Sequence, residues 1–234
     1  MSLSKRLLTA TELVTNGNIV ADIGCDHAYT SIYLCSEGIA PQVFAMDVNK
    51  GPLLAARQHV AAAGLEDKIT IRESDGLAAL APGEAETILL CGMGGLLMIK
   101  ILTDHPEVTA SARELILQPQ SEVGQVRHFL HKAGYAITAE RMVKEDGKFY
   151  VMMRAVMAEE PQSYEAECFY EYGKLLIEEK NVVLQEFLQR ERRLRTEVLA
   201  ALEAQDTEHV RTRRESLGKE FALIEEAERL IEKG

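Results

Sequence analysis

A strand-to-helix turn near the N-terminus carries the residues best suited to chemistry. The stretch "VADIGCDHAY" runs from an apolar segment through Gly24 into Asp26, His27 and Tyr29. Such a turn exposes backbone N–H groups at a helix N-terminus, where they attract an anion. The dinucleotide fingerprint places three glycines there to admit a pyrophosphate. Here only Gly24 is present, and a carboxylate at position 26 would repel a pyrophosphate.

A ligand with cationic groups and no phosphate fits this turn better. S-adenosylmethionine carries one carboxylate, one ammonium and a sulfonium. The turn amides suit the carboxylate, and Asp22 or Asp26 suits the ammonium and the nearby sulfonium. Alternatively, both acids are turn and cap residues, because aspartate is common in those positions. The pattern predicts an S-adenosylmethionine site and leaves a structural role for the acids open.

Two more acids follow at the ends of the next two predicted strands. Asp47 comes 25 residues after Asp22 and is placed to accept the ribose hydroxyls of an adenosine, and Asp75 to meet the adenine amino group. Taken alone, either acid could equally be a solvent-exposed residue at the end of a strand, with no ligand to bind. Three acids at the carboxyl ends of consecutive parallel strands, however, favour a ligand site. The predicted cofactor-binding residues are Asp22, Gly24, Cys25, Asp26, Asp47, Val48, Ser74, Asp75, Gly76, Cys91 and Gly92.

The fourth predicted strand ends in "CGMGG", Cys91 to Gly95, where a methyltransferase presents its target. Glycines there let a planar base approach the backbone, although they equally form a tight strand-to-helix turn. No Asn-Pro-Pro-aromatic signature for exocyclic amino groups accompanies them. The predicted substrate-binding residues are Lys5, Arg6, Tyr29, Met93, Gly94 and Tyr150.

Alternating strand and helix signals supply the framework for these residues. Strands that alternate with helices predict a parallel sheet covered on both faces, and a closing hairpin adds an antiparallel strand, which is typical of methyltransferases. We therefore expect an α/β fold, a Rossmann-like class I methyltransferase sheet with a closing β-hairpin. The predicted strands are 18–24, 41–47, 68–76, 86–95, 114–120, 135–143 and 147–157.

The last third of the chain predicts a separate helical part. The stretch "MAEEPQS" is punctuated by Pro161, after which the sequence is rich in Glu, Lys, Arg and Leu. We expect a methyltransferase domain over 1–160 and an antiparallel helical (coiled-coil) subdomain over 161–234, with a helix break at Gln205–Thr207. The apolar positions that suggest the pairing are Val183, Phe187, Leu194, Val198, Leu217, Phe221, Ile224 and Ile231.

The amino-acid composition limits the classes of protein to which this chain can belong. The 234 residues are 47% hydrophobic and 27% charged, as in an ordinary globular protein, and the net charge of −11 argues against a broad nucleic-acid footprint. The apolar runs are too short to cross a bilayer, and the N-terminal stretch predicts an amphipathic helix rather than a signal peptide. The four cysteines have no metal-ligand spacing and suit a reducing cytoplasm. We expect a cytoplasmic monomer with no bound metal.

The sequence resembles the TrmK family of bacterial tRNA (adenine-22-N1)-methyltransferases. The matching pieces are "LSKRL", "ADIGCDHAY", "CGMGG", "LILQPQ" and the helical appendage, so the resemblance covers essentially the whole chain. Cys25 departs from the family pattern, which has threonine there. The resemblance implies methyl transfer from S-adenosylmethionine to N1 of an adenosine in tRNA. The alternative is a small-molecule methyltransferase, for which an acidic surface is unremarkable.

Asp26 and His27 are the predicted catalytic residues. Adenine N1 has an in-plane lone pair and needs no deprotonation, so most of the rate would come from placing it in line with the methyl group. The ring becomes cationic, and a nearby carboxylate would stabilise that charge. His27 either hydrogen-bonds the base or only anchors the turn.

Overall fold

The computed structural model describes residues 3–202 and 207–233, which form two compact units, Met1–Gln162 and Ser163–Gly234. The predicted domain boundary between residues 160 and 161 precedes this division by two residues. Of the predicted helix break, Gln205 and Asp206 lie outside the described residues.

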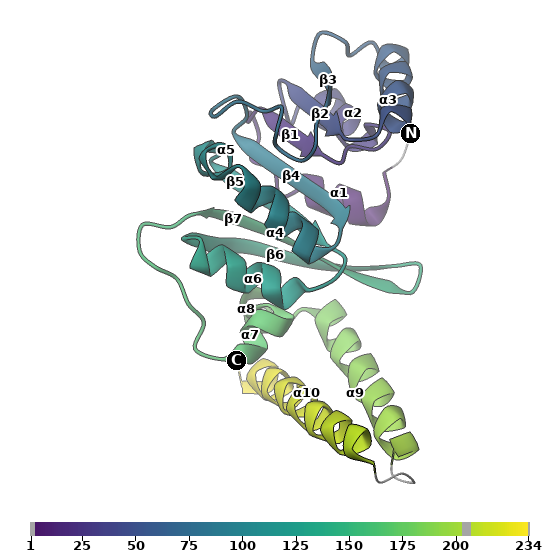
Figure 1. Cartoon of the computed structure of the whole chain (residues 1–234), viewed down its shortest axis with the longest axis vertical. Helices are drawn as coiled ribbons and strands as arrows, with labels where there is room; N and C mark the ends of the chain where they lie inside the picture. The colour runs from purple at the N-terminus through teal and green to yellow at the C-terminus, as the bar shows by residue number, and fades with distance from the viewer. Residues whose placement is uncertain (1–2, 203–206, 234) are drawn as a thin grey trace. The chain divides into compact units, whose positions relative to one another are not determined.

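The first unit is built on a seven-stranded sheet in the order β3-β2-β1-β4-β5-β7-β6 (Figure 1). Strands β1 to β5 pair in parallel, whereas β7 is antiparallel to both β5 and β6. This arrangement confirms the predicted methyltransferase sheet with its closing hairpin. The strands are β1 (Val20–Ile23), β2 (Val43–Asp47), β3 (Ile69–Glu73), β4 (Thr87–Met93), β5 (Glu114–Pro119), β6 (Tyr135–Glu145) and β7 (Lys148–Met157).

The connections place helices on both faces of the sheet. From β1 to β3 the chain moves in one direction, and from β4 to β5 it moves in the other, so right-handed crossovers put the two sets of helices on opposite faces. Helix α5 was not predicted as a separate element. The helices are α1 (Lys5–Thr11), α2 (Tyr29–Ser36), α3 (Lys50–Ala63), α4 (Gly95–Asp104), α5 (Pro106–Ser111) and α6 (Val123–Lys132).

A buried apolar cluster joins α1, α2 and α3 to the sheet. It includes Ala10 from α1, Leu34 from α2 and Val60 from α3, packed with strand residues such as Val43 and Met152. Because the cluster reaches from β3 to the β6–β7 hairpin, it holds the N-terminal helix against the same face as α2. This packed core therefore holds the first turn of α2 and the start of α1 in place.

The second unit is helical, but it is not one continuous helix that folds back. It begins with two short helices, α7 (Glu167–Tyr172) and α8 (Lys174–Glu178), before the long helices α9 (Val182–Leu202) and α10 (Glu208–Lys233). Gly173, at φ +94°, and Lys180, at φ +51°, interrupt the helical path. The expected helical subdomain is therefore present, but it contains two further interruptions, because both positions have left-handed or irregular backbone.

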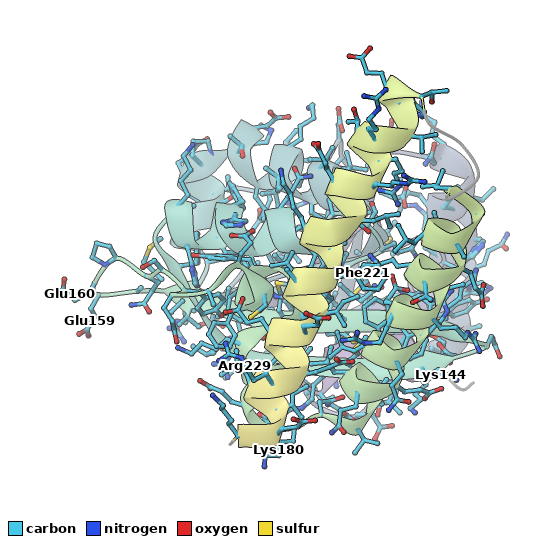
Figure 2. The ribbon with its side chains drawn as sticks, turned by 90° about the horizontal axis from the view of Figure 1, so that it is seen from below. Lys144, Glu159, Glu160, Lys180, Phe221 and Arg229 are labelled. Atoms are coloured by element: carbon cyan, nitrogen blue, oxygen red, sulfur yellow. The ribbon has the colours of Figure 1, made fainter. Side chains whose placement is uncertain are left out.

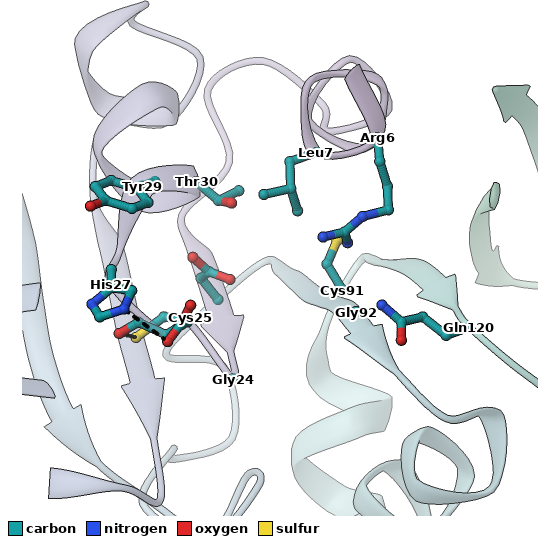
Figure 3. A pocket seen from close by; sticks show the side chains of 12 residues that line it. Arg6, Leu7, Gly24, Cys25, His27, Tyr29, Thr30, Cys91, Gly92 and Gln120 are labelled. Atoms are coloured by element: carbon teal, nitrogen blue, oxygen red, sulfur yellow. Dashed lines mark hydrogen bonds and ion pairs between the residues drawn. The ribbon is translucent and has the colours of Figure 1, made fainter. Parts of the chain in front are cut away.

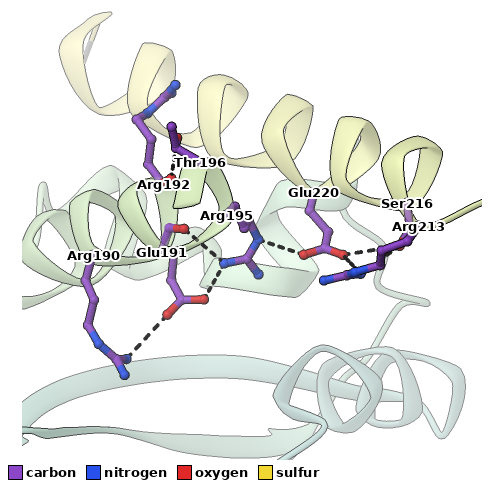
Figure 4. Close-up of polar contacts among 8 residues, drawn as sticks. All are labelled: Arg190, Glu191, Arg192, Arg195, Thr196, Arg213, Ser216 and Glu220. Carbon is purple, nitrogen blue, oxygen red and sulfur yellow. Dashed lines mark hydrogen bonds and ion pairs between the residues drawn. The ribbon is translucent and has the colours of Figure 1, made fainter. Parts of the chain in front are cut away.

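Ion pairs show that α9 and α10 run antiparallel. Arg195 pairs with Glu220 at 2.7 Å, and Arg192, one turn earlier on α9, pairs with Glu228, two turns later on α10. Figure 4 shows Glu220 between Arg195 and Arg213. Charged side chains such as Arg229 also project from α10 in Figure 2.

The apolar seam of this helical pair differs from the prediction on one helix. On α10 the predicted Leu217, Ile224 and Ile231 are buried, whereas on α9 the buried residues are Leu184 and Leu188. The predicted α9 positions Leu194 and Val198 are 36% and 41% exposed. Within the described residues of both units, no helix is long and apolar enough to cross a membrane.

Candidate active site

A cavity of about 290 Å³ opens at the carboxyl ends of β1 and β4. These neighbouring strands are where the chain reverses its direction of travel across the sheet, and open α/β sheets bind ligands at that point. Figure 3 shows the α2 side chains facing those of α1 and β4 across the cavity. The lining residues are Arg6, Leu7, Asp22, Gly24, Cys25, Asp26, His27, Tyr29, Thr30, Cys91, Gly92 and Gln120.

Half of the predicted site residues meet in this cavity. These are Arg6, Asp22, Gly24, Cys25, Asp26, His27, Tyr29, Cys91 and Gly92. Within the described ranges, the remaining predicted residues do not line it. These are Lys5, Asp47, Val48, Ser74, Asp75, Gly76, Met93, Gly94 and Tyr150.

The turn after β1 explains why an aspartate replaces a glycine. Gly24, Asp26 and Ala28 have φ values of +73°, +51° and +60°, so three alternate residues are left-handed. Aspartate tolerates this conformation better than most residues other than glycine. Asp26 therefore keeps the backbone path that glycine would allow and adds a carboxylate, with an exposed side chain, at the edge of the cavity.

The amides of this turn are used within the protein. The N–H groups of Gly24 and Cys25 both donate to the carbonyl of Met46, at 2.8 and 3.0 Å, and that of Asp26 donates to the Asp47 carboxylate at 3.2 Å. This differs from the expectation that these amides are open to a ligand's carboxylate. Their role here is to join the β1 turn to β2, so the cationic Arg6 becomes the lining group suited to an anion.

Asp22 is the buried acid of the site. Its side chain is 3% exposed and accepts a hydrogen bond from the Ser31 hydroxyl at 2.6 Å. Burial raises the pKa of Asp22 to about 6, and repulsion from Asp47 adds to the rise, while hydrogen bonds from Ser31 oppose it. A cation placed beside this carboxylate would compensate for its lost hydration.

Asp47 and the turn after β3 organise the neighbouring edge of the sheet. The Asp47 carboxylate also accepts the N–H of Asn49 at 2.8 Å, and its backbone carbonyl accepts the N–H of Ser74 at 2.9 Å. The Ser74 hydroxyl donates to the carbonyl of Gly76 and so holds the turn. Asp75 is exposed and lies two residues beyond the end of β3, because the strand ends at Glu73, earlier than in the predicted range 68–76.

The end of β4 is tied to β5 and α1. Gly92, at φ +78°, donates its N–H to the side-chain oxygen of Gln118 at 3.1 Å, and the Arg6 guanidinium donates to the same oxygen at 2.5 Å. A Cβ atom at Gly92 would lie 3.3 Å from the Arg6 guanidinium. This glycine therefore admits Arg6 to the cavity wall, where Figure 3 shows it above Gly92 and Gln120.

The glycines that follow serve packing. A Cβ atom at Gly95 would lie 2.6 Å from the carbonyl oxygen of Ser121 and 2.8 Å from Val126. Gly94 precedes α4 as its N-cap residue, and Met93 packs its terminal methyl against Gly24. Gly95 is therefore required by close packing at the start of α4, while Gly92 shapes the cavity.

Helix α1 is anchored at its start. The backbone N–H groups of Lys5 and Arg6 donate to the Glu145 carboxylate at the end of β6, at 2.5 and 3.2 Å. The Arg6 guanidinium lies over the Tyr150 ring at 5.5 Å, so Tyr150 supports Arg6 without lining the cavity. Lys5 is exposed.

Similarity to known proteins decides the family. Residues 3–153 match the methyltransferase domain family. Over 230 residues, covering 97% of each chain, the sequence is 33% identical to the tRNA (adenine(22)-N(1))-methyltransferase of Bacillus subtilis (strain 168). The chain belongs to the TrmK family. This confirms the resemblance drawn from the sequence motifs.

Solved TrmK-family structures share the fold over nearly the whole chain. Bacillus subtilis TrmK, an M1A22 tRNA methyltransferase, matches with a TM-score of 0.87 at 33% identity, covering 97% of this chain and 98% of that one. Sp1610 of Streptococcus pneumoniae, solved in complex with S-adenosyl-L-methionine, matches with a TM-score of 0.84 at 31% identity, covering 97% and 99%. TrmK of M. capricolum, solved in complex with S-adenosyl-homocysteine, matches with a TM-score of 0.79 at 25% identity, covering 96% and 100%.

This TrmK-family cavity also contains residues that sequence reasoning missed. Gln120 follows β5, the next parallel strand after β4, so the strand-end argument that selected Asp47 could have found it. Leu7 and Thr30 have no polar motif that would single them out. His59 does not line the cavity, but it contacts two residues that do, and periodicity along α3 gave no reason to connect it with the turn.

Two thiols and an imidazole are further groups in the cavity of this TrmK-family protein. Burial raises the pKa values of Cys25 and Cys91, so both remain neutral thiols. Among residues 3–202 and 207–233, no group of three or more His, Cys, Asp or Glu side chains is placed to hold a metal ion. The Nδ1 atom of His27 is buried without a hydrogen-bond partner in that part of the chain, which suits it to a ligand.

Proposed function

We propose that this chain transfers the methyl group of S-adenosylmethionine to N1 of adenosine 22 in tRNA. The observation that carries the proposal is the similarity, over 97% of both chains, to the Bacillus subtilis tRNA (adenine(22)-N(1))-methyltransferase. The complexes of TrmK-family proteins with S-adenosyl-L-methionine and S-adenosyl-homocysteine support the choice of cofactor.

The residues at the carboxyl edge of the sheet fit this cofactor. Asp22 and Asp26 offer two carboxylates for the ammonium and sulfonium groups, and Arg6 offers a cation for the carboxylate. Beyond the cavity, we assign Asp47, at the end of β2, to the ribose hydroxyls, and Val48 with the residues from Ser74 to Gly76 to the adenine. When bound, S-adenosylmethionine supplies an electrophilic methyl group.

The chain's own task is then to place and stabilise the acceptor. The lone pair of adenine N1 lies in the ring plane, so no base is needed to remove a proton, and orientation supplies most of the rate. The carboxylate of Asp26 stabilises the positive charge that develops on the ring. Tyr29 and Gly92 offer an aromatic face and an open backbone edge to a flat base, and the Nδ1 atom of His27 is a hydrogen-bonding group for it.

The acceptor has to leave its stack to reach this cavity. Base extrusion is the usual route for an enzyme that modifies a base in structured nucleic acid. Lys5 is exposed at the start of α1 beside the lining residue Arg6, and we assign both cations to contacts with the RNA backbone. We further propose that the chain acts as a monomer in the cytoplasm, a reducing compartment that suits its free cysteines Cys25, Cys35, Cys91 and Cys168.

One assay tests this function directly. The protein is incubated with S-adenosylmethionine labelled at the methyl group and an unmodified tRNA, which is then digested to nucleosides for mass spectrometry. The expected product is N1-methyladenosine, which blocks the Watson–Crick edge and stops reverse transcription at position 22. The matched control is the same tRNA with guanosine at position 22, which should remain unlabelled. Labelled N6-methyladenosine, a methylated guanosine, or no RNA product would reject the proposal, and the last result would favour a small-molecule methyltransferase.

A further inference from the structure

His59 connects α3 to the turn that carries the proposed catalytic residues. Its Nδ1 atom lies 3.1 Å from the carbonyl oxygen of His27. Its ring stacks on that of Tyr29, with 4.8 Å between centroids and 24° between planes. The His27 and His59 rings are also neighbours, at 5.8 Å in an edge-on arrangement. One partly buried side chain therefore contacts both the backbone and an aromatic ring of the cavity wall.

The hydrogen bond determines which nitrogen of His59 carries the proton. A carbonyl oxygen can only accept, so Nδ1 must donate. The neutral ring is then the Nδ1–H tautomer, with Nε2 deprotonated. Because the partner is a backbone carbonyl, the bond restrains the main chain of the turn at His27, between two left-handed residues, Asp26 and Ala28.

The turn needs such restraint, since non-glycine residues in left-handed conformation are strained and persist only where their surroundings hold them. Asp47 holds one end through the N–H of Asp26. The carbonyl of Cys25 accepts the N–H of Ala28 at 2.8 Å. His59 supplies a contact from α3 to His27, which lies between Asp26 and Ala28.

We propose that His59 is a positioning residue for methyl transfer. Its Nδ1–H holds the His27 carbonyl, and its ring supports Tyr29, so that the Tyr29 face and the Asp26 carboxylate are fixed relative to the acceptor base. His59 does not touch the reacting atoms, because it lies outside the cavity lining. This inference rests on the proposed function and adds a residue from α3 that orients the acceptor.

Three substitutions separate the two contacts. His59→Ala removes both, His59→Asn keeps an N–H donor near the position of Nδ1, and His59→Phe keeps only the stacked ring. Removal of one hydrogen bond that matters in the transition state corresponds to about a threefold to tenfold change in rate. We expect kcat for tRNA to fall about tenfold in His59→Ala and by less in each of the other two. The dissociation constant for S-adenosylmethionine should rise less than kcat falls, because Asp22, the buried acid proposed to meet the cofactor's cations, is held by Ser31 and not by His59.

The matched control is Gln58→Ala, which removes an exposed side chain from the same turn of α3 and should leave kcat unchanged. An unchanged kcat in His59→Ala would overturn the inference. So would losses of melting temperature and cofactor affinity that parallel the loss of rate in all three variants, because a merely structural residue behaves in that way.

A second measurement keeps this test distinct from that of the proposed function. If the wild-type chain makes no N1-methyladenosine, the proposed function fails in the tRNA assay, and the role in methyl transfer fails with it. The geometry is tested separately by long-range ¹H–¹⁵N NMR of the histidine rings above pH 8. The expected spectrum assigns the Nδ1–H tautomer to His59, and the Nε2–H tautomer would overturn the inference whatever the activity.

Discussion

The carboxylate of Asp47 accepts the backbone N–H of Asp26 at 3.2 Å. This bond joins the end of β2 to the turn after β1, although the two residues are 21 positions apart in the chain. The proposed ribose-binding acid and the proposed catalytic carboxylate are therefore not independent. A change at Asp47 alters both the cofactor contact and the backbone that presents Asp26.

Asp47→Ala should weaken the binding of S-adenosylmethionine by about 1–3 kcal/mol, because it removes a charge-assisted hydrogen bond to ribose. Isothermal titration calorimetry measures this loss. The control is Glu73→Ala, which removes a carboxylate from the end of the adjacent strand, where it pairs with Lys50 at 3.9 Å. Equal affinities for wild type and Asp47→Ala would remove Asp47 from the cofactor site.

Cofactor affinity should fall as the pH is lowered through 6. Burial raises the pKa of Asp22 to about 6, so its carboxylate is largely ionised at pH 7 and largely protonated at pH 5. Only the ionised form attracts an ammonium or sulfonium group. The affinity should drop about tenfold between pH 7 and pH 5, as the charged fraction does. Equilibrium dialysis measures the affinity for S-adenosylmethionine at each pH. The Asp22→Asn variant should show a much weaker dependence of affinity on pH. An unchanged pH profile in that variant would argue against a role for Asp22.

Gly92→Ala should impair both cofactor binding and tRNA methylation, because Arg6 is proposed to meet the cofactor carboxylate and the RNA backbone. The new methyl group would lie 3.3 Å from the Arg6 guanidinium, and the backbone at φ +78° disfavours alanine. We expect kcat/KM for tRNA to fall about tenfold or more if Arg6 moves. The control is Gly83→Ala, with φ +76° and no atom within 4 Å of its Cβ position, which tests the backbone strain alone. Equal effects of the two substitutions on activity would show that Arg6 is not involved.

Alanine substitutions at two glycines should change the free energy of unfolding in opposite directions. Gly95→Ala would place a Cβ atom 2.6 Å from a backbone carbonyl, so it should lower the free energy of unfolding by about 1–3 kcal/mol or more. Gly218→Ala, within α10 and with open space around it, should raise it by about 0.5–1 kcal/mol. Calorimetry compares the two variants. A stable Gly95→Ala protein would mean that the loop at Ser121 shifts at little cost.

The helical unit should be dispensable for cofactor binding. We expect a chain that ends at Gln162 to bind S-adenosylmethionine with nearly unchanged affinity, because every residue that lines the cavity precedes that position. The same truncation should lower methylation of tRNA. Titration calorimetry and the nucleoside assay measure the two activities. Lost cofactor affinity in a truncated protein with a native circular dichroism spectrum would contradict this separation.

The sheet was predictable from the sequence because its signals are local. Apolar runs, glycines after helices and acids at strand ends each occupy a few residues, and the right-handed crossover rule converts their order into a topology. The hairpin was also visible, since Asp146 and Gly147 supply two consecutive left-handed residues between β6 and β7.

The remaining features depend on contacts between distant residues. The acceptor for the amides of Gly24 and Cys25 is a carbonyl on β2, and nothing in the turn itself reveals it. His59 reaches the turn because α3 packs beside α2, so its role needs three dimensions. On α9, the spacing that selected Leu194 and Val198 is shared by the helix face that contains Leu184 and Leu188, and only packing distinguishes them.

The ion pairs between α9 and α10 have a consequence for how this unit would respond to salt. Arg192, Arg195 and Arg213 each face a carboxylate already. A phosphate that approaches such a pair must displace a glutamate, because the arginine is already compensated. Few counterions are then released from the nucleic acid in net terms. The slope of log affinity against log salt counts phosphates that are newly neutralised. For any polyanion that contacts these helices, that slope should be shallower than the number of arginines suggests.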